Sequence, residues 1–434
     1  MCDDQAQTLP RPKRFDRGKI CAKCNSVTGN LVVRHSVYCK ACLVSTVSLK
    51  VRRDLDRALE GFTSGSGRGN VLIGYSGGAG SSMLADIVRR EYIDTSLSLV
   101  QPMKRQGSKK PPSWRSSVWN NAYIAYVDLS AALGGKAGLS SIMELAKHYP
   151  QYTLVSLHVQ DAFDPAWWHR VTGQELSALL HPRFEDETIL GWDSVPFPTP
   201  DAALKAFLDA LPSSSSTVMA LRHLLRVLLL YTAKSLACSH VLLGDSIISL
   251  STSLLSSIAS GSGHVLRHEQ TEQWGDIHIL RPIAGLTTKE CAAWVHWNRI
   301  PLLHGIHGLN GDSSIQKLSA DFLHDLERDF PSTLFTIVKT CNKVESLSIP
   351  LSPCIFCLRP RPAGVGTWRS HTAIRSRKQC ILVPEEGDLN LCPACQRAML
   401  GLGQRGDVAI DWIPFPVWVN FNQSYPQVQG QHDK

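Results

Sequence analysis

The stretch NVLIGYSGGAGSSMLADIV, from Asn70 to Val88, constrains the possible folds of this chain more than any other part of the sequence. An apolar run, Val71–Tyr75, meets the turn Ser76-Gly77-Gly78, and a helical pattern then begins at Ser81. A strand, a glycine turn and a helix in this order form the repeating unit of parallel α/β sheets. The turn has the shape of a phosphate cradle, but it holds no lysine, and Gly80 stands where a carboxylate is expected.

Strand and helix patterns alternate along the chain from Val71 onward, which predicts an α/β fold with a parallel sheet covered by helices on both faces. A polar, basic loop at 101–117 and an insertion near 160–200 interrupt the alternation. The predicted strands are Val71–Tyr75, Tyr123–Asp128, Thr153–His158, His240–Leu243 and Asp276–Leu280. The predicted helices are Ser82–Tyr92, Leu139–His148, Thr217–Ala237, Ser246–Ser260 and Thr288–Arg299.

Open parallel sheets bind ligands beyond the carboxyl ends of their strands, where a loop and the start of a helix meet. Backbone N–H groups at a helix start can hold a phosphate without any side chain. The turn is therefore a candidate nucleotide-binding site, formed by Ser76, Gly77, Gly78, Gly80 and Ser81. The alternative is a tight strand-to-helix turn that binds nothing.

Eight of the thirteen cysteines fall into four CxxC units. The first two units are separated by 14 residues of β-rich character. Two facing CxxC turns supply the four soft ligands of a tetrahedral zinc ion, and in a reducing compartment a disulfide is the weaker explanation. The sequence predicts a structural zinc site at Cys21, Cys24, Cys39 and Cys42.

The other two CxxC units predict a second zinc site, formed by Cys354, Cys357, Cys392 and Cys395. The gap of 34 residues between them is long for a zinc ribbon, and Cys380 inside the gap is a competing ligand. A closed shell of four thiolates leaves no position for substrate, so both sites are predicted to be structural. His304 and His307 are a further candidate metal pair, without a carboxylate or cysteine pattern beside them.

The formal net charge of +8 is unevenly distributed. Residues 5–53 carry eleven Lys and Arg against one acid, and residues 346–384 carry six basic residues and no acid. Both segments coincide with a cysteine motif, and basic patches of this kind are typical of nucleic-acid binders. The alternative is a solvated surface. The candidate RNA contacts are Lys50, Arg52, Arg53, Arg359, Arg361, Arg375, Arg377 and Lys378.

These features divide the chain into an N-terminal zinc-ribbon module (1–53), an α/β domain (54–345) and a C-terminal zinc-binding module with an aromatic tail (346–434). The tail segment Asp411–Phe421 is expected either to dock a partner or to pack on its own core. No long stretch is consistently apolar and uncharged, and the first residues lack the apolar core of a secretory signal. We therefore expect an intracellular protein without a transmembrane helix.

The glycine turn resembles the signature SGGxDS of the adenosine-nucleotide α-hydrolase group, whose members carry a pyrophosphatase loop. The signature is matched by Ser76, Gly77, Gly78 and Ser81, with Gly80 in place of the aspartate. The segment His240–Gly261 resembles a later strand and helix of the group, but only Gly244-Asp245 remains of the usual Gly-His-x-x-Asp-Asp stretch. A third segment, Leu280–Leu303, resembles the group at Pro282, Lys289, Glu290 and Pro301.

With a cysteine module on each side of this domain, the chain most resembles the cytoplasmic tRNA 2-thiolation protein 2 family, over most of its length. The resemblance implies a heterodimer with a catalytic thiolase subunit in the cytoplasm. It further implies that the pair thiolates the wobble uridine of lysine, glutamine and glutamate tRNAs. Sulfur would arrive as the thiocarboxylate of a ubiquitin-like carrier.

The distribution of cysteines indicates the role of this chain within such a pair. Active relatives carry a CxxC in the middle of the nucleotide domain, whereas this chain has no cysteine from Leu43 to Ala237. Cys238 and Cys291 are expected to pack as small hydrophobic residues. Because thiolates deliver the sulfur and Mg²⁺ needs oxygen ligands beside the phosphates, we predict a non-catalytic subunit. The alternatives are an active ATP-dependent thiolation or adenylating enzyme, and a zinc-ribbon scaffold unrelated to RNA modification.

Overall fold

A six-stranded sheet forms the centre of the computed structural model, which describes residues 20–33, 36–59, 69–94, 118–134, 139–174, 199–266, 268–270, 272–302, 313–344, 350–362, 391–399 and 414–419. Along the sheet the order is β5 (Thr153–His158), β4 (Ala122–Asp128), β3 (Asn70–Gly74), β6 (Cys238–Leu243), β8 (Ile277–Leu280) and β7 (Glu272–Trp274). All neighbours pair in parallel except β7, which runs antiparallel to β8 at one edge. The chain proceeds from β3 outward to β5 and then returns to β6, so the topological switch point lies between β3 and β6.

The apolar sequence of β3 accounts for the layers around the sheet. Val71, Leu72 and Ile73 are fully buried. Because successive side chains point to opposite faces of a strand, Val71 and Ile73 join the apolar cluster on one face and Leu72 joins that on the other. A strand that is apolar on both faces needs cover on both sides, which is characteristic of parallel sheets. The predicted fold class is confirmed.

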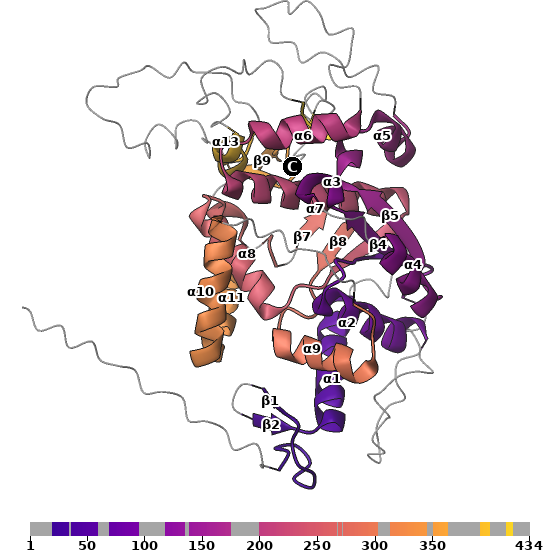
Figure 1. Cartoon of the computed structure of the whole chain (residues 1–434), viewed down its shortest axis with the longest axis vertical. Coiled ribbons are helices and arrows are strands. Elements are labelled where there is room, and N and C mark those ends of the chain that lie inside the picture. Colours follow the sequence, from indigo (N-terminus) through magenta and orange to yellow (C-terminus); the bar gives the residue numbers. More distant parts are fainter. Residues whose placement is uncertain are drawn as a thin grey trace, which may run out of the picture.

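The helices form two covering layers and one separate bundle (Figure 1). One face of the sheet is covered by α1 (Lys40–Leu59), α2 (Ala79–Val88), α4 (Leu139–His148) and α9 (Thr288–Asn298). The other face is covered by α7 (Ser214–Ser235), against which α5 (Pro165–Thr172) and α6 (Pro200–Ala210) pack. The short helix α3 (Ser130–Leu133) follows β4. The bundle beside the sheet consists of α8 (Ile247–Ala259), α10 (Ile315–Asp329) and α11 (Pro331–Lys343).

Most predicted elements of the alternating region occur within a few residues of their expected bounds. The predicted strand Thr153–His158 and helix Leu139–His148 coincide with β5 and α4. The predicted helix Ser82–Tyr92 ends as a π-helical turn over Arg89–Ile93. The sequence patterns did not predict the edge strand β7 or the bundle helices α10 and α11. The loop at 101–117 and most of the insertion, residues 175–198, lie outside the described residues.

Helix α9 begins at a capping box formed by Thr287 and by Glu290, one of the residues that carry the resemblance described above. The Thr287 hydroxyl accepts a hydrogen bond from the Glu290 backbone N–H at 3.3 Å, and the Glu290 carboxylate accepts one from the Thr287 N–H at 2.7 Å. The two side chains satisfy N–H groups that have no partner at a helix start. In this chain Glu290 therefore has a structural role, starting the helix that covers α2.

Helix α1 connects the first cysteine motif directly to the core of the α/β domain. It starts at Lys40, inside the second CxxC unit, and its apolar residues recur every fourth position; those buried in the core are Leu43, Val47, Val51, Leu55 and Leu59. The buried Glu91 carboxylate accepts a hydrogen bond from the Ser48 hydroxyl at 2.8 Å and pairs with Arg52 at 3.5 Å. The expected boundary between residues 53 and 54 thus lies within one continuous helix.

The C-terminal elements pack on α7 and so on the same chain. They comprise the hairpin of β9 (Pro350–Pro353) and β10 (Pro360–Pro362), the helix α13 (Pro393–Met399) and residues 414–419. In the described part of the aromatic tail, Trp418 is fully buried and donates its indole N–H to the Phe356 carbonyl at 3.0 Å. Of the two expectations for the tail, packing on its own core applies to these residues. None of the described helices is long and apolar enough to cross a membrane.

The docking of α1 can be tested at Leu55, which is fully buried against the α/β core. We expect Leu55→Ala to lower the free energy of unfolding by about 2–5 kcal/mol, because it removes apolar contacts and leaves a cavity. The exposed neighbour Arg57→Ala is the control, expected to change stability by about 0.5 kcal/mol or less. Urea unfolding of the full chain measures both. Equal, small effects would show that α1 does not belong to the core.

Candidate functional site: a strand-end pocket and two cysteine clusters

A pocket of about 640 Å³ lies at the carboxyl ends of β3 and β6, at the switch point of the sheet. The glycine turn forms one wall, α7 forms a second, and α8 together with α10 forms a third. This is the place where ligands bind in open α/β sheets, and the volume is that of a small-molecule site.

Three of the four arginines that line the pocket are paired with carboxylates. Arg281 meets Asp245 at 3.0 Å. Arg226 pairs with Glu272, and Arg359 pairs with Glu269 and, at 3.6 Å, with Glu272. Although burial alone would raise the pKa of Glu272, Arg226 and Arg359 hold it below its usual value. The pairs formed by Glu269 and Glu272 are buried charges that neutralise one another, whereas the Asp245 side chain is 38% exposed.

The side chains of the glycine turn are hydrogen-bonded to the turn itself. Ser76 donates its backbone N–H to the Ser81 hydroxyl at 3.3 Å, and Ser81 donates to the Gly78 carbonyl at 3.1 Å. Of the five predicted nucleotide-binding residues, Ser76, Gly77 and Gly78 line the pocket, whereas Ser81 is buried beneath them. Only Gly77 needs the conformational freedom of glycine, with φ of 80°.

Gly80 is the residue that stands in place of the expected carboxylate, and the structure leaves no room for a side chain there. A Cβ at Gly80 would lie 2.3 Å from the Gly244 carbonyl oxygen and 3.3 Å from Ile283 Cδ1. A Cβ at Gly244 would in turn lie 2.5 Å from the Ser81 backbone nitrogen. The start of α2 and the end of β6 are therefore in direct backbone contact, and an aspartate at position 80 would force them apart.

No described cysteine lines the pocket. Cys238 begins β6, at the end of the strand opposite the turn, and burial raises its pKa to about 12. Cys291 lies on α9 in the core on the other face, and burial, followed by the charge of Glu290, raises its pKa to about 12. Both remain protonated thiols at neutral pH, which are poor nucleophiles. They pack as small apolar residues, as predicted.

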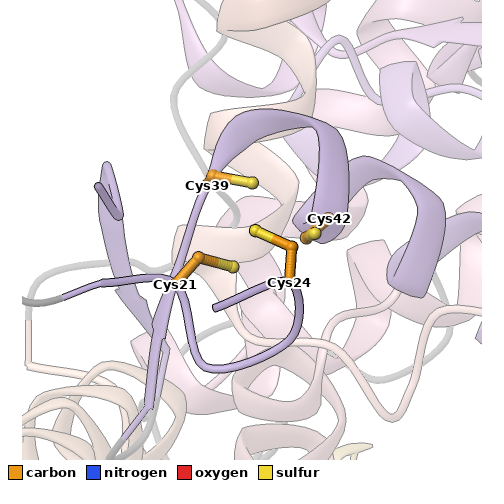
Figure 2. Close-up of side chains that lie close together, drawn as sticks. All are labelled: Cys21, Cys24, Cys39 and Cys42. Atoms are coloured by element: carbon orange, nitrogen blue, oxygen red, sulfur yellow. The ribbon is translucent and has the colours of Figure 1, made fainter. Parts of the chain in front are cut away.

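The first four predicted zinc ligands come together in one cluster (Figure 2). Cys21 and Cys24 lie in a turn, Cys39 precedes α1 and Cys42 lies in its first turn, and the four sulfur atoms point toward one another. Hydrogen bonds from the Ser26 side chain and backbone lower the pKa of Cys24 to about 6. Burial and the neighbouring thiols raise that of Cys42 to about 12. Four thiolates this close are stable only around a cation.

The second set of four predicted ligands also comes together, and all four of its cysteines are buried. Cys354 and Cys357 lie in a turn after β9, whereas Cys392 and Cys395 lie at the start of α13. Arg226 on α7 donates to the Cys357 carbonyl at 2.6 Å, so the cluster is tied to the wall of the pocket. The competing ligand Cys380 and the pair His304 and His307 lie outside the described residues.

Both clusters fit a metal ion. In each, ligand atoms from all four cysteines lie within 4.8 Å of one another. A tetrahedral ion bound at about 2.3 Å by sulfur requires ligand separations of about 3.8 Å, and the sulfur atoms of Cys357 and Cys392 lie 3.8 Å apart. The four-cysteine shell is closed, so such an ion would support the fold and would not touch a substrate.

The candidate RNA contacts differ widely in their exposure. Arg359 and Arg361 are 6% and 4% exposed, and therefore do not face the solvent. Lys50 donates to the Gly285 carbonyl, and Arg52 pairs with Glu91. Arg53 is exposed on α1. The remaining three candidates, Arg375, Arg377 and Lys378, lie outside the described residues.

Sequence reasoning missed the residues that shape the pocket away from the glycine turn. Arg222 and Arg226 lie one turn apart on the otherwise apolar helix α7 and face the pocket. Their spacing of four residues was a readable signal, because two cations on one side of a buried helix require partners. The partner of Arg226, Glu272, comes from a segment with no recognisable motif, and no described carboxylate forms an ion pair with Arg222.

Comparison with known proteins finds similarity to tRNA thiolation proteins. A family model described as cytoplasmic tRNA 2-thiolation protein 2 matches residues 314–398, from α10 to α13. The protein of that name from Danio rerio is 27% identical over 380 residues, which cover 78% of this chain and 71% of the relative. The corresponding protein from Xenopus tropicalis is 24% identical over 411 residues, covering 84% and 78%.

Two solved structures resemble the chain more distantly. A U34-tRNA thiolase from Methanococcus maripaludis, solved with its 4Fe–4S cluster, has a TM-score of 0.45 and 13% identity, covering 76% of this chain and 90% of that one. An NMN synthetase from Francisella tularensis has a TM-score of 0.34 and 10% identity, covering 71% and 98%.

The backbone contact at Gly80 predicts that alanine substitution lowers stability much more at Gly80 than at Gly78, a glycine of the same turn. We expect Gly80→Ala to destabilise the chain by about 1–3 kcal/mol, because overpacking against the Gly244 carbonyl outweighs the better helix propensity of alanine. A Cβ at Gly78 meets only Ser76 Oγ at 3.7 Å, so Gly78→Ala is the matched control and is expected to be tolerated. Thermal unfolding compares the two; a stable Gly80→Ala variant would contradict the contact.

Proposed function

The chain belongs to the cytoplasmic tRNA 2-thiolation protein 2 family, and from this premise we propose that it acts in tRNA thiolation as a subunit that holds RNA and transfers no sulfur itself. Its partner is a catalytic thiolase subunit, with which it forms a heterodimer in the cytoplasm. The pair modifies the wobble uridine of lysine, glutamine and glutamate tRNAs. The sulfur comes from the thiocarboxylate of a ubiquitin-like carrier.

One observation carries the non-catalytic role: among the described residues, the strand-end pocket contains neither a thiol nor a carboxylate on its glycine turn. Thiolation replaces an oxygen of uridine by sulfur. ATP must first activate that oxygen, and a sulfur nucleophile then attacks the carbon while the activated oxygen leaves. A protonated, buried thiol such as Cys238 supplies no nucleophile. The closed contact at Gly80 provides no carboxylate for magnesium.

The surface proposed to grip RNA centres on the first cysteine cluster and on helix α1. Lys23 beside the cluster and Arg53 and Arg57 on α1 are exposed and belong to one continuous segment of structure. Cations on a rigid helix contact phosphates without reading the base sequence, and so position the tRNA. Arg359 and Arg361 are buried, so neither candidate near the second cluster is available to contact RNA. Arg359 instead lines the pocket, where it pairs with Glu269.

We retain three modules as a working division: residues 1–53, 54–345 and 346–434. The first supplies RNA contacts, the second resembles the catalytic partner in fold and supports it, and the third closes the pocket. Helix α1 crosses the first boundary and α7 packs against the third module, so the three modules share apolar contacts.

The RNA-gripping role predicts a salt-dependent loss of affinity on charge reversal. We expect Arg53→Glu with Arg57→Glu to weaken tRNA binding by the complex with its thiolase partner about tenfold or more near 0.1 M salt, and to flatten the salt dependence. Filter binding between about 0.05 and 0.2 M salt measures this. Arg328→Glu on α10, an equally exposed arginine, is the control. Negligible tRNA affinity of the unaltered protein, alone and with its partner, would rule out the role.

Both cysteine clusters are proposed to hold structural zinc. The short sulfur separations favour a single ion over a four-iron cluster, whose ligand sulfurs surround a cage of metal atoms and lie further apart. We expect elemental analysis of the purified chain to give two zinc ions, and Cys354→Ser to lose one of them together with much of the stability. Cys238→Ser, a buried thiol outside the clusters, serves as the control and keeps both. Iron in place of zinc would refute the assignment.

An active ATP-dependent enzyme remains the competing function, and it is excluded or established by one assay. The non-catalytic proposal expects no ATP–pyrophosphate exchange by the isolated chain. Clear turnover would overturn it.

A further inference from the structure

The strand-end pocket contains one arginine more than it has carboxylates to pair with. Arg226, Arg281 and Arg359 each meet an acid, whereas Arg222 on α7 makes no hydrogen bond or ion pair within the described part of the chain. Glu269 and Asp245 lie near enough to act on it electrostatically, but both already face another arginine. His223 does not alter this balance, because burial lowers its pKa to about 4 and leaves it neutral.

An uncompensated cation in a desolvated place is costly to a protein unless a ligand makes use of it. Arg222 is partly buried, and the partial loss of solvent around its guanidinium lowers its pKa. The guanidinium lines the pocket, where an anion could reach it. The charge balance therefore indicates an anionic ligand.

Gln316 on α10 provides an independent sign of a ligand in the same pocket. Its side chain is 3% exposed and lines the pocket, yet its Oε1 atom has no hydrogen-bond partner among the described residues. A buried acceptor without a donor costs free energy comparable to a lost hydrogen bond. A ligand that donates an N–H or O–H to this oxygen would remove the cost.

The two residues belong to a part of the pocket distinct from the glycine turn. Arg222 lies on α7 and Gln316 near the start of α10, and the two helices are joined by the hydrogen bond from Ile315 N–H to the Ser215 hydroxyl at 2.9 Å. Ser249, exposed on the first turn of α8, adds a hydroxyl on the third side of this region. A cation, a hydroxyl donor and an acceptor from three helices suit a phosphate group that carries a donor or is attached to one.

We propose that this pocket binds a small phosphate-bearing molecule, with the phosphate on Arg222 and a hydrogen-bond donor of the ligand on Gln316. Its source is either free phosphate or a nucleotide, for which the pocket volume of about 640 Å³ is sufficient. The site uses α7, α8 and α10, not the glycine turn, and it needs no catalytic residue. It does not depend on the RNA-gripping role and would stand if that role failed.

The proposal predicts opposite effects of Arg222→Met on stability and on binding. Without ligand, the variant is expected to melt higher than the unaltered chain, on the order of 2 °C or more, because an unpaired, desolvated charge is replaced by an apolar side chain of similar length. Its affinity for the ligand is expected to fall about tenfold or more, the loss that accompanies removal of a charged hydrogen bond. A purely structural arginine would instead lower the melting temperature when removed.

The experiment titrates the full-length chain with inorganic phosphate and with AMP by isothermal titration calorimetry, and records melting temperatures with each. Equal binding of both identifies free phosphate as the source, whereas tighter binding of AMP identifies a nucleotide. Arg222→Lys keeps the charge and is expected to bind measurably but more weakly. If Arg222→Met does not fold, Arg222→Lys and Gln316→Leu carry the comparison.

Arg328→Met, at an exposed arginine on α10 outside the pocket lining, is the matched control and is expected to bind as the unaltered chain does. Ser76→Ala tests the glycine turn as the alternative anion site. Three results would overturn the proposal: no binding of either probe at millimolar concentration, unchanged affinity in the Arg222 and Gln316 variants, or loss of binding in Ser76→Ala alone. The last would assign the anion to the glycine turn.

Discussion

Two buried glutamates, Glu269 and Glu272, hold the C-terminal cysteine cluster against the central sheet. Their carboxylates meet Arg226 from α7 and Arg359 from the turn between β9 and β10, and Arg226 also donates to the Cys357 carbonyl. Removing one partner from such a buried network costs about 3–5 kcal/mol, because the remaining charge is left without solvent or counter-ion. The C-terminal elements close the pocket on this side, Arg359 is buried, and Arg222 is left without a carboxylate partner among the described residues. All three features follow from this one network of ion pairs.

The glycine turn, on another wall of the pocket, has no carboxylate at position 80, and the reason is close packing and not disorder. The glycine turn keeps the backbone of a phosphate loop, but Gly80 and Gly244 are so close that their backbones exclude a side chain. The hydroxyls of Ser76 and Ser81 are hydrogen-bonded to each other at 3.3 Å. The hydrogen bonds of this loop are satisfied without a nucleotide, which is consistent with the proposed non-catalytic role.

Helix α1 makes the N-terminal cysteine cluster part of the same rigid unit. The helix begins within the cluster and ends in the core, so the exposed arginines on it are fixed relative to the sheet. Rigid placement matters for the proposed tRNA contacts, since phosphate contacts that move with a flexible arm would hold a tRNA in no defined orientation. The packing of α1 would give its exposed charges a defined position on the proposed RNA surface.

Sequence alone determined what depends on local spacing. The strand at Thr153–His158, the helix at Leu139–His148 and both cysteine clusters were predictable, because apolar periodicity and CxxC spacing are fixed by neighbouring residues. The edge strand β7 was missed because three residues carry no measurable period.

Only the tertiary structure decided which charged side chains are exposed and free to bind a ligand, and which are buried in ion pairs. Arg359 and Arg53 look alike in the sequence, but Arg359 meets Glu269, 90 residues away, and is buried, whereas Arg53 stays in solvent. No local pattern links such a pair, since its two members are brought together by the packing of α7 and the sheet. The same holds for Arg222. Its lack of an ion-pair partner within the described part of the chain can be recognised only after each nearby carboxylate has been assigned to another arginine. Spacing along the chain fixes the elements, and long-range burial of charge fixes what their side chains can do.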